Sequence, residues 1–211
     1  MGKTPRRGKR TIRIKDPVRR DQRLAFFKLL EEEKIRQFLA SDTCFRISDK
    51  YLLAMVLAYF RRGGFELSEY TVLNFFTALT LANKVEEEVP FHEEIYPWAL
   101  GATWWELLPQ FKALQDLLWI RMNFQAIVTK EMCSEIMAED RTHWAWTRER
   151  RTHHGFAKRF YLRTEEECSI RGPGRSPREC ELCVTKPAPY HLRSSTSSRH
   201  CPVAERRAAR K

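Results

Sequence analysis

A run of ten residues, 51–60, is apolar on every face that a helix would present. Such a helix has to be enclosed by other elements, because it has no polar face to offer to water. The run is too short to cross a bilayer, which takes about 20 apolar residues. A second stretch of this kind spans 70–82 and follows a turn that contains Gly63 and Gly64. The sequence therefore predicts two enclosed helices, paired as a hairpin, at the centre of a helical domain.

Other segments carry apolar residues at helical intervals. The longest of them predicts a helix from about 22 to 40. Residues 85–94 are acidic and contain a proline, so we expect a loop there. No alternating strand pattern of useful length occurs, and the predicted fold class is all-α, with five or six helices over residues 21–140.

Residue types that accept hydrogen bonds from the first turn of a helix mark the expected helix starts. Ser48 is the expected N-cap of the first enclosed helix, with Asp49 in its first turn, where the helix dipole favours a carboxylate. Thr103 and Glu106 have the spacing of a capping box. Thr129 is expected to cap a shorter helix near residue 132.

The net charge of +11 over 211 residues is unevenly distributed. Residues 1–20 hold nine basic residues against one acidic residue, and residues 141–211 hold seventeen against seven. Residues 21–140 hold twelve basic against nineteen acidic residues. The predicted folded part is therefore acidic and suits a partner with cationic groups, whereas the basic ends suit nuclear import or weak nucleic-acid contact.

Composition also divides the chain into three parts. Residues 1–20 lack apolar periodicity and are expected to form a disordered basic arm, and residues 161–211, rich in Arg, Pro and Ser, a disordered tail. The folded domain is predicted over 21–160. No apolar stretch follows the basic start, so we expect no secretory signal and an intracellular protein.

Motifs of enzyme chemistry are missing from the sequence. It has no Gly-rich phosphate loop, kinase signature or His-Glu-x-x-His pattern. The run from Glu86 to Glu88 lacks the spacing of a calcium loop and is interpreted as solvated. His153 and His154 lack an orienting carboxylate pattern beyond Glu149, so a catalytic role is not expected. We predict a protein that is not an enzyme and needs no cofactor.

Six cysteines in a chain without a signal peptide indicate reduced thiols. Cys180 and Cys183 have the spacing of half a zinc site. The other candidate ligands near them are Cys168, His191, His200 and Cys201. These lack a regular spacing for the second half, so the interpretation favours thiols without a metal, and no metal site is predicted.

Two tryptophans, Trp144 and Trp146, lie in a stretch rich in aromatic and basic residues. Interleaved Trp and Arg can stack on nucleic-acid bases. The favoured interpretation is that both tryptophans pack against the end of the bundle.

Several stretches resemble the core of the Speedy/RINGO family of cyclin-dependent kinase activators. The most specific are Asp-Lys-Tyr-Leu-Leu-Ala-Met at 49–55 and Pro-Trp-Ala-Leu-Gly at 97–101. The matching stretches, in the family's order, are 26–30, 47–56, 74–83, 85–88, 94–101, 118–122 and 143–155. The resemblance, of the Speedy A/C type, implies a fold like a single cyclin box. It also implies binding and activation of cyclin-dependent kinases 1 and 2 in the nucleus, in cell-cycle or meiotic progression.

An activator of this kind must order the kinase's activation segment, which is normally fixed by a phosphothreonine held by Arg side chains. Carboxylates can supply comparable charge to those arginines. Asp49 begins the enclosed helix, where side chains are expected to project outward, and the resemblance places it at the activation segment. An antiparallel hairpin would bring Glu86, Glu87 and Glu88 to the same end. These four residues, with Tyr51 for apolar contact, are the predicted kinase-binding residues.

The hypothesis is activation largely independent of activation-loop phosphorylation, in a complex of one activator with one kinase. Two alternatives remain open. One is a meiotic nuclear scaffold that tethers partners through its tails without activating them. The other is a protein that binds nucleic acid through its basic ends, although the acidic charge of the core argues against it.

Overall fold

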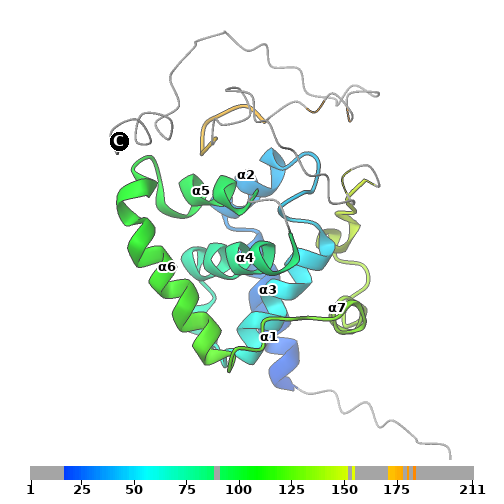
Figure 1. Ribbon diagram of the computed structural model, residues 1–211. Coiled ribbons are helices and arrows are strands. Elements are labelled where there is room, and N and C mark those ends of the chain that lie inside the picture. Colours follow the sequence, from blue (N-terminus) through cyan, green and yellow to red (C-terminus); the bar gives the residue numbers. More distant parts are fainter. Residues whose placement is uncertain are drawn as a thin grey trace, which may run out of the picture.

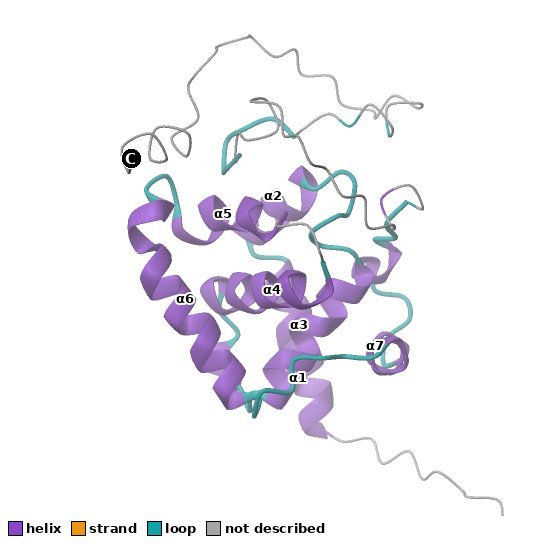
Figure 2. Ribbon diagram, in the orientation of Figure 1, coloured by secondary structure: helices purple, strands orange, loops and turns teal. Residues whose placement is uncertain are grey.

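Helices and turns make up all the regular structure in the described part of the chain (Figure 2). This computed structural model describes residues 17–87, 91–151, 154, 171–177, 180 and 183. The α-helices are α1 (Pro17–Leu30), α2 (Glu33–Ser41), α3 (Lys50–Arg62), α4 (Val72–Glu86), α5 (Tyr96–Leu100), α6 (Trp104–Arg121) and α7 (Lys130–Ala138). Short 3-10 helices are η1 (Leu67–Glu69), η2 (Phe91–Ile95) and η3 (Trp144–Thr147). The predicted all-α class is confirmed, with more helices than expected.

The two enclosed apolar stretches form α3 and α4 at the centre of the molecule (Figure 1). Every residue from 52 to 60 in α3 is buried, and so is every residue from 75 to 83 in α4. The side-chain amide of Asn83 donates to the carbonyl of Ile47 over 3.0 Å. The end of α4 therefore lies beside the start of α3, and the predicted antiparallel pair is confirmed.

The remaining helices cover this central pair. Figure 1 shows α6 along one side, packed against α4 and α5, and α7 on the opposite side, packed against α3. Aromatic rings fill the space between elements: Phe38 of α2 meets Phe76 at 5.2 Å and Trp98 at 5.7 Å between ring centroids, both edge to face. The hydroxyl of Tyr59 donates to the carbonyl of Ala126 over 2.7 Å, so this buried polar group is satisfied.

The helix predicted from 22 to 40 is in fact two helices. It begins earlier, at Pro17, and is interrupted at Glu31 and Glu32, where the backbone N–H groups turn back to the carbonyls of Lys28 and Leu29 over 3.1 Å. The break lets both halves bury their apolar residues against the central pair, which one straight helix could not do. Propensity alone did not show this change of direction.

The predicted caps are partly correct. The N-cap of α3 is Asp49 and not Ser48. Thr129 caps α7 by accepting from the N–H of Met132, as predicted. The side chain of Thr103 makes no cap hydrogen bond, so the predicted capping box there is wrong.

The expected arm and tail lie mostly outside the described residues. Within the tail, residues 171–177 lie beside α2 and α5 (Figure 1, orange). A Cβ added at Gly172 would come within 2.8 Å of the Cβ of Pro97, so only glycine allows this close approach. The predicted domain boundaries stay a prediction. No helix among the described residues is long and apolar enough to cross a bilayer.

Candidate functional site

Asp49 lies at the start of α3, where its carboxylate caps the helix. Its Oδ1 atom accepts from the N–H groups of Tyr51 and Leu52, each over 2.9 Å. The residue is only 7 % exposed. The expectation that its side chain projects outward is therefore wrong, because capping turns the carboxylate back toward its own helix.

Arg150 bridges Asp49 and Glu87. Its Nε atom lies 3.1 Å from Oδ2 of Asp49, and its Nη2 atom lies 2.6 Å from Oε1 of Glu87. The same Nη2 donates to the carbonyl of Arg46 over 2.9 Å. The predicted grouping of Asp49 with Glu86 and Glu87 is geometrically correct. The bridging role of Arg150 was missed, since no spacing in the sequence connects residue 150 to either acid.

The carboxylates at this end outnumber the guanidinium that bridges two of them. Glu86 is exposed at the surface, but its carboxyl is partly shielded from water. This partial burial, and then the charges of Glu87 and Asp49, raise the pKa of Glu86, against the opposing effect of Arg150. Burial also raises the pKa of Asp49, which Arg150 opposes. We call Asp49, Glu86, Glu87 and Arg150 the acidic cluster. Its excess negative charge is the condition under which an additional cation binds favourably.

A buried polar network fixes the loop that leads into this cluster. Asp42 accepts from the N–H of Arg46 at 3.0 Å, the N–H of Ile47 at 3.1 Å and the hydroxyl of Ser48 at 2.7 Å. Arg148 donates from Nε to the carbonyl of Ser48 over 2.8 Å and from Nη2 to its hydroxyl over 2.6 Å. The segment around Arg148 and Arg150 thus lies across the start of α3.

The two other predicted kinase-binding residues are Tyr51 and Glu88. Tyr51 is half-buried and packs against the core, with Nζ of Lys50 at 5.4 Å from its ring centroid. Glu88 lies outside the described residues. The kinase-binding role of all five predicted residues stays a prediction.

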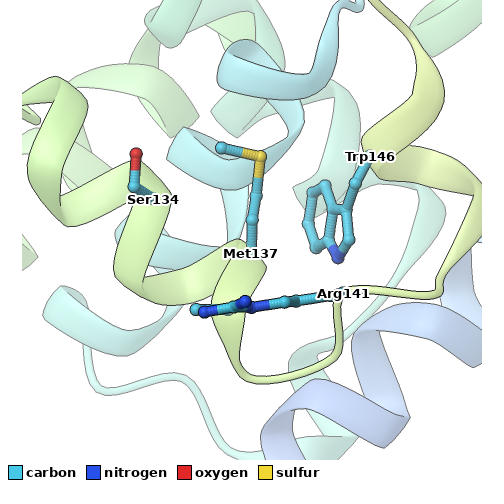
Figure 3. A pocket seen from close by; sticks show the side chains of 5 residues that line it. Ser134, Met137, Arg141 and Trp146 are labelled. Carbon is cyan, nitrogen blue, oxygen red and sulfur yellow. The ribbon is translucent and has the colours of Figure 1, made fainter.

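The tryptophans of the aromatic-basic stretch differ in exposure. Trp146 is buried and meets Phe27 edge to face, with 6.0 Å between centroids, as the packing interpretation predicts. Trp144 lies at the surface, where its Nε1 donates to Glu31 over 2.8 Å. Figure 3 shows Trp146 beside Met137 and Arg141 in a depression between α7 and η3. This depression is open to solvent, unlike the enclosed pocket that a small substrate usually occupies.

Four metal-ligating side chains meet at another place in the structure. Cys180 and Cys183 are joined there by Cys44 and His154, and their ligand atoms all lie within 4.8 Å of one another. Cys44 and His154 were missed in the sequence, because they are far along the chain from the Cys-x-x-Cys pair. His153 and the other candidate ligands of the tail lie outside the described residues.

The enclosed helical core, with the acidic cluster at one end of the α3–α4 pair, defines a single all-α class of domain. Residues 21–150 match the profile of the Spy1 family, described as cell cycle regulatory protein. The chain belongs to this family. The family is one of regulators and not of enzymes, so membership confirms both the predicted Speedy/RINGO resemblance and the predicted non-enzymatic class.

Individual relatives agree with the family match. The chain is 47 % identical to Speedy protein A of Rattus norvegicus over 182 residues, which cover 86 % of this chain and 58 % of the relative. It is 47 % identical to human Speedy protein C over 180 residues, 84 % of this chain and 65 % of the relative. Human Speedy protein E4 is 40 % identical over 128 residues, 60 % of this chain and 53 % of the relative. The chain thus spans less than two thirds of the length of these relatives.

Proposed function

We propose that this protein binds cyclin-dependent kinase 1 or 2 and activates it by ordering the activation segment, largely without activation-loop phosphorylation. The acidic cluster is the observation that supports this mechanism. Three carboxylates from two elements meet at one end of the α3–α4 pair, and Arg150 is the guanidinium that bridges two of them. The arginines that hold a phosphothreonine in an active kinase are cations of the kind that such a cluster attracts.

The carboxylates have different tasks in this mechanism. Glu86 is exposed, so its carboxylate is accessible to an arginine of the kinase. Glu87 is less accessible, at 18 % side-chain exposure, and contributes charge at the edge of the contact. Asp49 is buried and acts as a positioning residue, since it caps α3 and fixes Arg150.

The experiment adds purified full-length protein to unphosphorylated cyclin-dependent kinase 2 and follows phosphorylation of a kinase substrate. In the double variant Glu86→Gln and Glu87→Gln, we expect activation to fall by about tenfold, because contacts between close charge pairs are lost. The control is Glu106→Gln with Glu135→Gln, which removes the same charge at exposed positions of α6 and α7. The control should activate normally.

The outcomes separate the parts of the proposal. Full activation by the cluster variant would refute the electrostatic mechanism. A wild-type chain that neither binds nor activates kinase 1 or 2 would refute the proposed function and favour the scaffold alternative. Action in the nucleus and in meiotic progression is part of the same proposal, and fluorescence imaging of the tagged chain in dividing cells tests its nuclear location.

A further inference from the structure

Four side chains from three distant segments converge beside the loop between α2 and α3. Cys44 belongs to that loop, His154 follows the segment that carries Arg150, and Cys180 and Cys183 come from the C-terminal part of the chain. The Sγ atoms of Cys44 and Cys183 are 3.5 Å apart. Nε2 of His154 lies 3.3 Å from Sγ of Cys183 and 3.4 Å from Sγ of Cys180.

These three distances are close to, and slightly shorter than, those between the ligands of one tetrahedral metal ion. With Zn–S bonds of about 2.3 Å and Zn–N bonds of about 2.0 Å, neighbouring ligand atoms lie about 3.5 to 3.8 Å apart. The backbone supports this arrangement, since the N–H of Cys183 donates to the carbonyl of Cys180 over 2.8 Å. This turn directs both sulfurs of the Cys-x-x-Cys pair toward the same centre.

We propose that Cys44, His154, Cys180 and Cys183 form a structural zinc site. Three sulfurs and one imidazole nitrogen are soft and borderline ligands, which favour zinc over calcium or magnesium. Four protein ligands fill the tetrahedral coordination shell, so no position is left for water or a substrate. The site is therefore structural and not catalytic.

Binding exchanges protons for the metal and involves no redox step. The three thiols bind as thiolates and release three protons, while His154 binds as neutral imidazole through Nε2. The 2+ charge of zinc against three thiolates leaves the site with one negative charge.

A disulfide is the competing explanation for such close cysteines. The Sγ–Sγ separation of 3.5 Å between Cys44 and Cys183 is far longer than a disulfide bond of about 2.05 Å. A disulfide also gives no reason for an imidazole nitrogen within 3.4 Å of two sulfurs. A shared metal ion accounts for all four side chains.

The zinc would attach the C-terminal segment to the helical domain. The attached segment packs nearby, where residues of α2, α5 and their loops share a surface depression with it. This depression is lined by residues that include Ser41, Trp98, Arg171, Gly172 and Pro177. Arg171 donates to the carbonyls of Ser176 at 3.0 Å and Pro177 at 3.4 Å, which closes the segment on itself. The zinc would thus join the loop before α3 to two later segments, and this role does not depend on kinase binding.

The test uses the full-length chain, expressed in zinc-supplemented medium and purified without chelator under reducing conditions. Elemental analysis should find about one zinc per chain in the wild type. Cys180→Ser and Cys183→Ser should lose the metal. These two positions lie outside the enclosed core, and circular dichroism checks that the helices persist. Cys133→Ser is the control for a cysteine outside the four-residue cluster, because Cys133 lies in α7 with its Sγ 3.9 Å from the carbonyl of Tyr51. This variant should keep the zinc, and circular dichroism checks that it is folded, since Cys133 is buried.

Two further measurements complete the test. Cobalt substitution should give the intense visible bands of tetrahedral thiolate ligation, and they should be absent in Cys183→Ser. A chelator should lower the Tm of the wild type but not that of Cys183→Ser. A folded wild-type chain without metal, zinc retained in the Cys180 and Cys183 variants, or a disulfide among these cysteines found by mass spectrometry would each overturn the proposal.

Discussion

At the scale of single residues, Asp49 has two tasks that substitutions can separate. It caps α3 through two backbone N–H groups, and it forms an ion pair with Arg150. Asparagine caps a helix about as well as aspartate but carries no charge. Alanine neither caps the helix nor carries a charge. We expect Asp49→Ala to unfold with a free energy about 1 kcal/mol lower than Asp49→Asn, measured by denaturant titration.

The same pair of variants tests the positioning role of Asp49. If this buried carboxylate acts through the fold and does not contact the kinase, Asp49→Asn should retain most of the activation of cyclin-dependent kinase 2. Equal stability of the two variants would contradict the capping role. Loss of activation in a stable Asp49→Asn variant would show that the charge itself is required at the interface.

At the scale of elements, one ion pair connects three helices. Nη1 and Nη2 of Arg61, in the last turn of α3, each lie 2.7 Å from an oxygen of Glu139, which follows α7. Arg23 of α1 donates to the backbone carbonyl of Glu139 over 3.0 Å. Both partners of the pair are largely buried, with side-chain exposures of 14 % and 19 %, so the paired oxygens cannot exchange freely for water.

Glu139→Gln should therefore destabilise the fold by about 1 to 3 kcal/mol, because hydrogen bonds to a charged partner are weakened at a largely buried site. The matched control is Glu69→Gln, which breaks a pair of the same chemistry with Arg121 at a more accessible surface. Denaturant unfolding of both variants provides the measurement. A loss in Glu69→Gln as large as in Glu139→Gln would show that burial does not determine the effect.

A helix is predictable from the sequence where its own residues determine whether it is buried or exposed. The enclosed helices were predictable, because residues 51–60 have no polar face and must therefore be surrounded by other elements. The break between α1 and α2 was not, since both halves have helical periodicity and only their packing against the α3–α4 pair shows the change of direction. Local signals correctly predicted the cap at Thr129. They also predicted a cap at Thr103, which the side chain of Thr103 does not form.

At the scale of the whole molecule, contacts between residues far apart in the sequence are the ones that could not be predicted. The grouping of Asp49 with Glu86 and Glu87 was predictable from an antiparallel hairpin, which is a simple topology. The ion pairs of Arg150 depend on where the segment after η3 crosses the domain. The same holds for the contact between Cys44 and Cys183, which are 139 residues apart. No periodicity or spacing encodes such crossings, so these parts of both sites required the structure.

Acid stability is a property of the whole fold, and His92 lies where three elements meet. It belongs to η2, close to Lys84 of α4 and Lys112 of α6. Burial, and then these two lysines, lower its pKa from 6.5 to about 4. Between those pH values the unfolded chain binds a proton at His92 and the folded chain does not. The free energy of unfolding therefore falls as the pH drops through this range.

We expect His92 to contribute a loss on the order of 2 kcal/mol between pH 6.5 and 4, within the limit set by about 1.4 kcal/mol per pKa unit. His92→Phe keeps a ring at this position but removes the titrating group, so its stability should fall less over the same range. Carboxylates titrate in both proteins, and the measured quantity is thus the difference between the two unfolding curves at each pH. That difference should be constant above pH 7 and should change in favour of the variant below pH 6.5. Parallel curves would mean that His92 is protonated as readily in the folded chain as in the unfolded one.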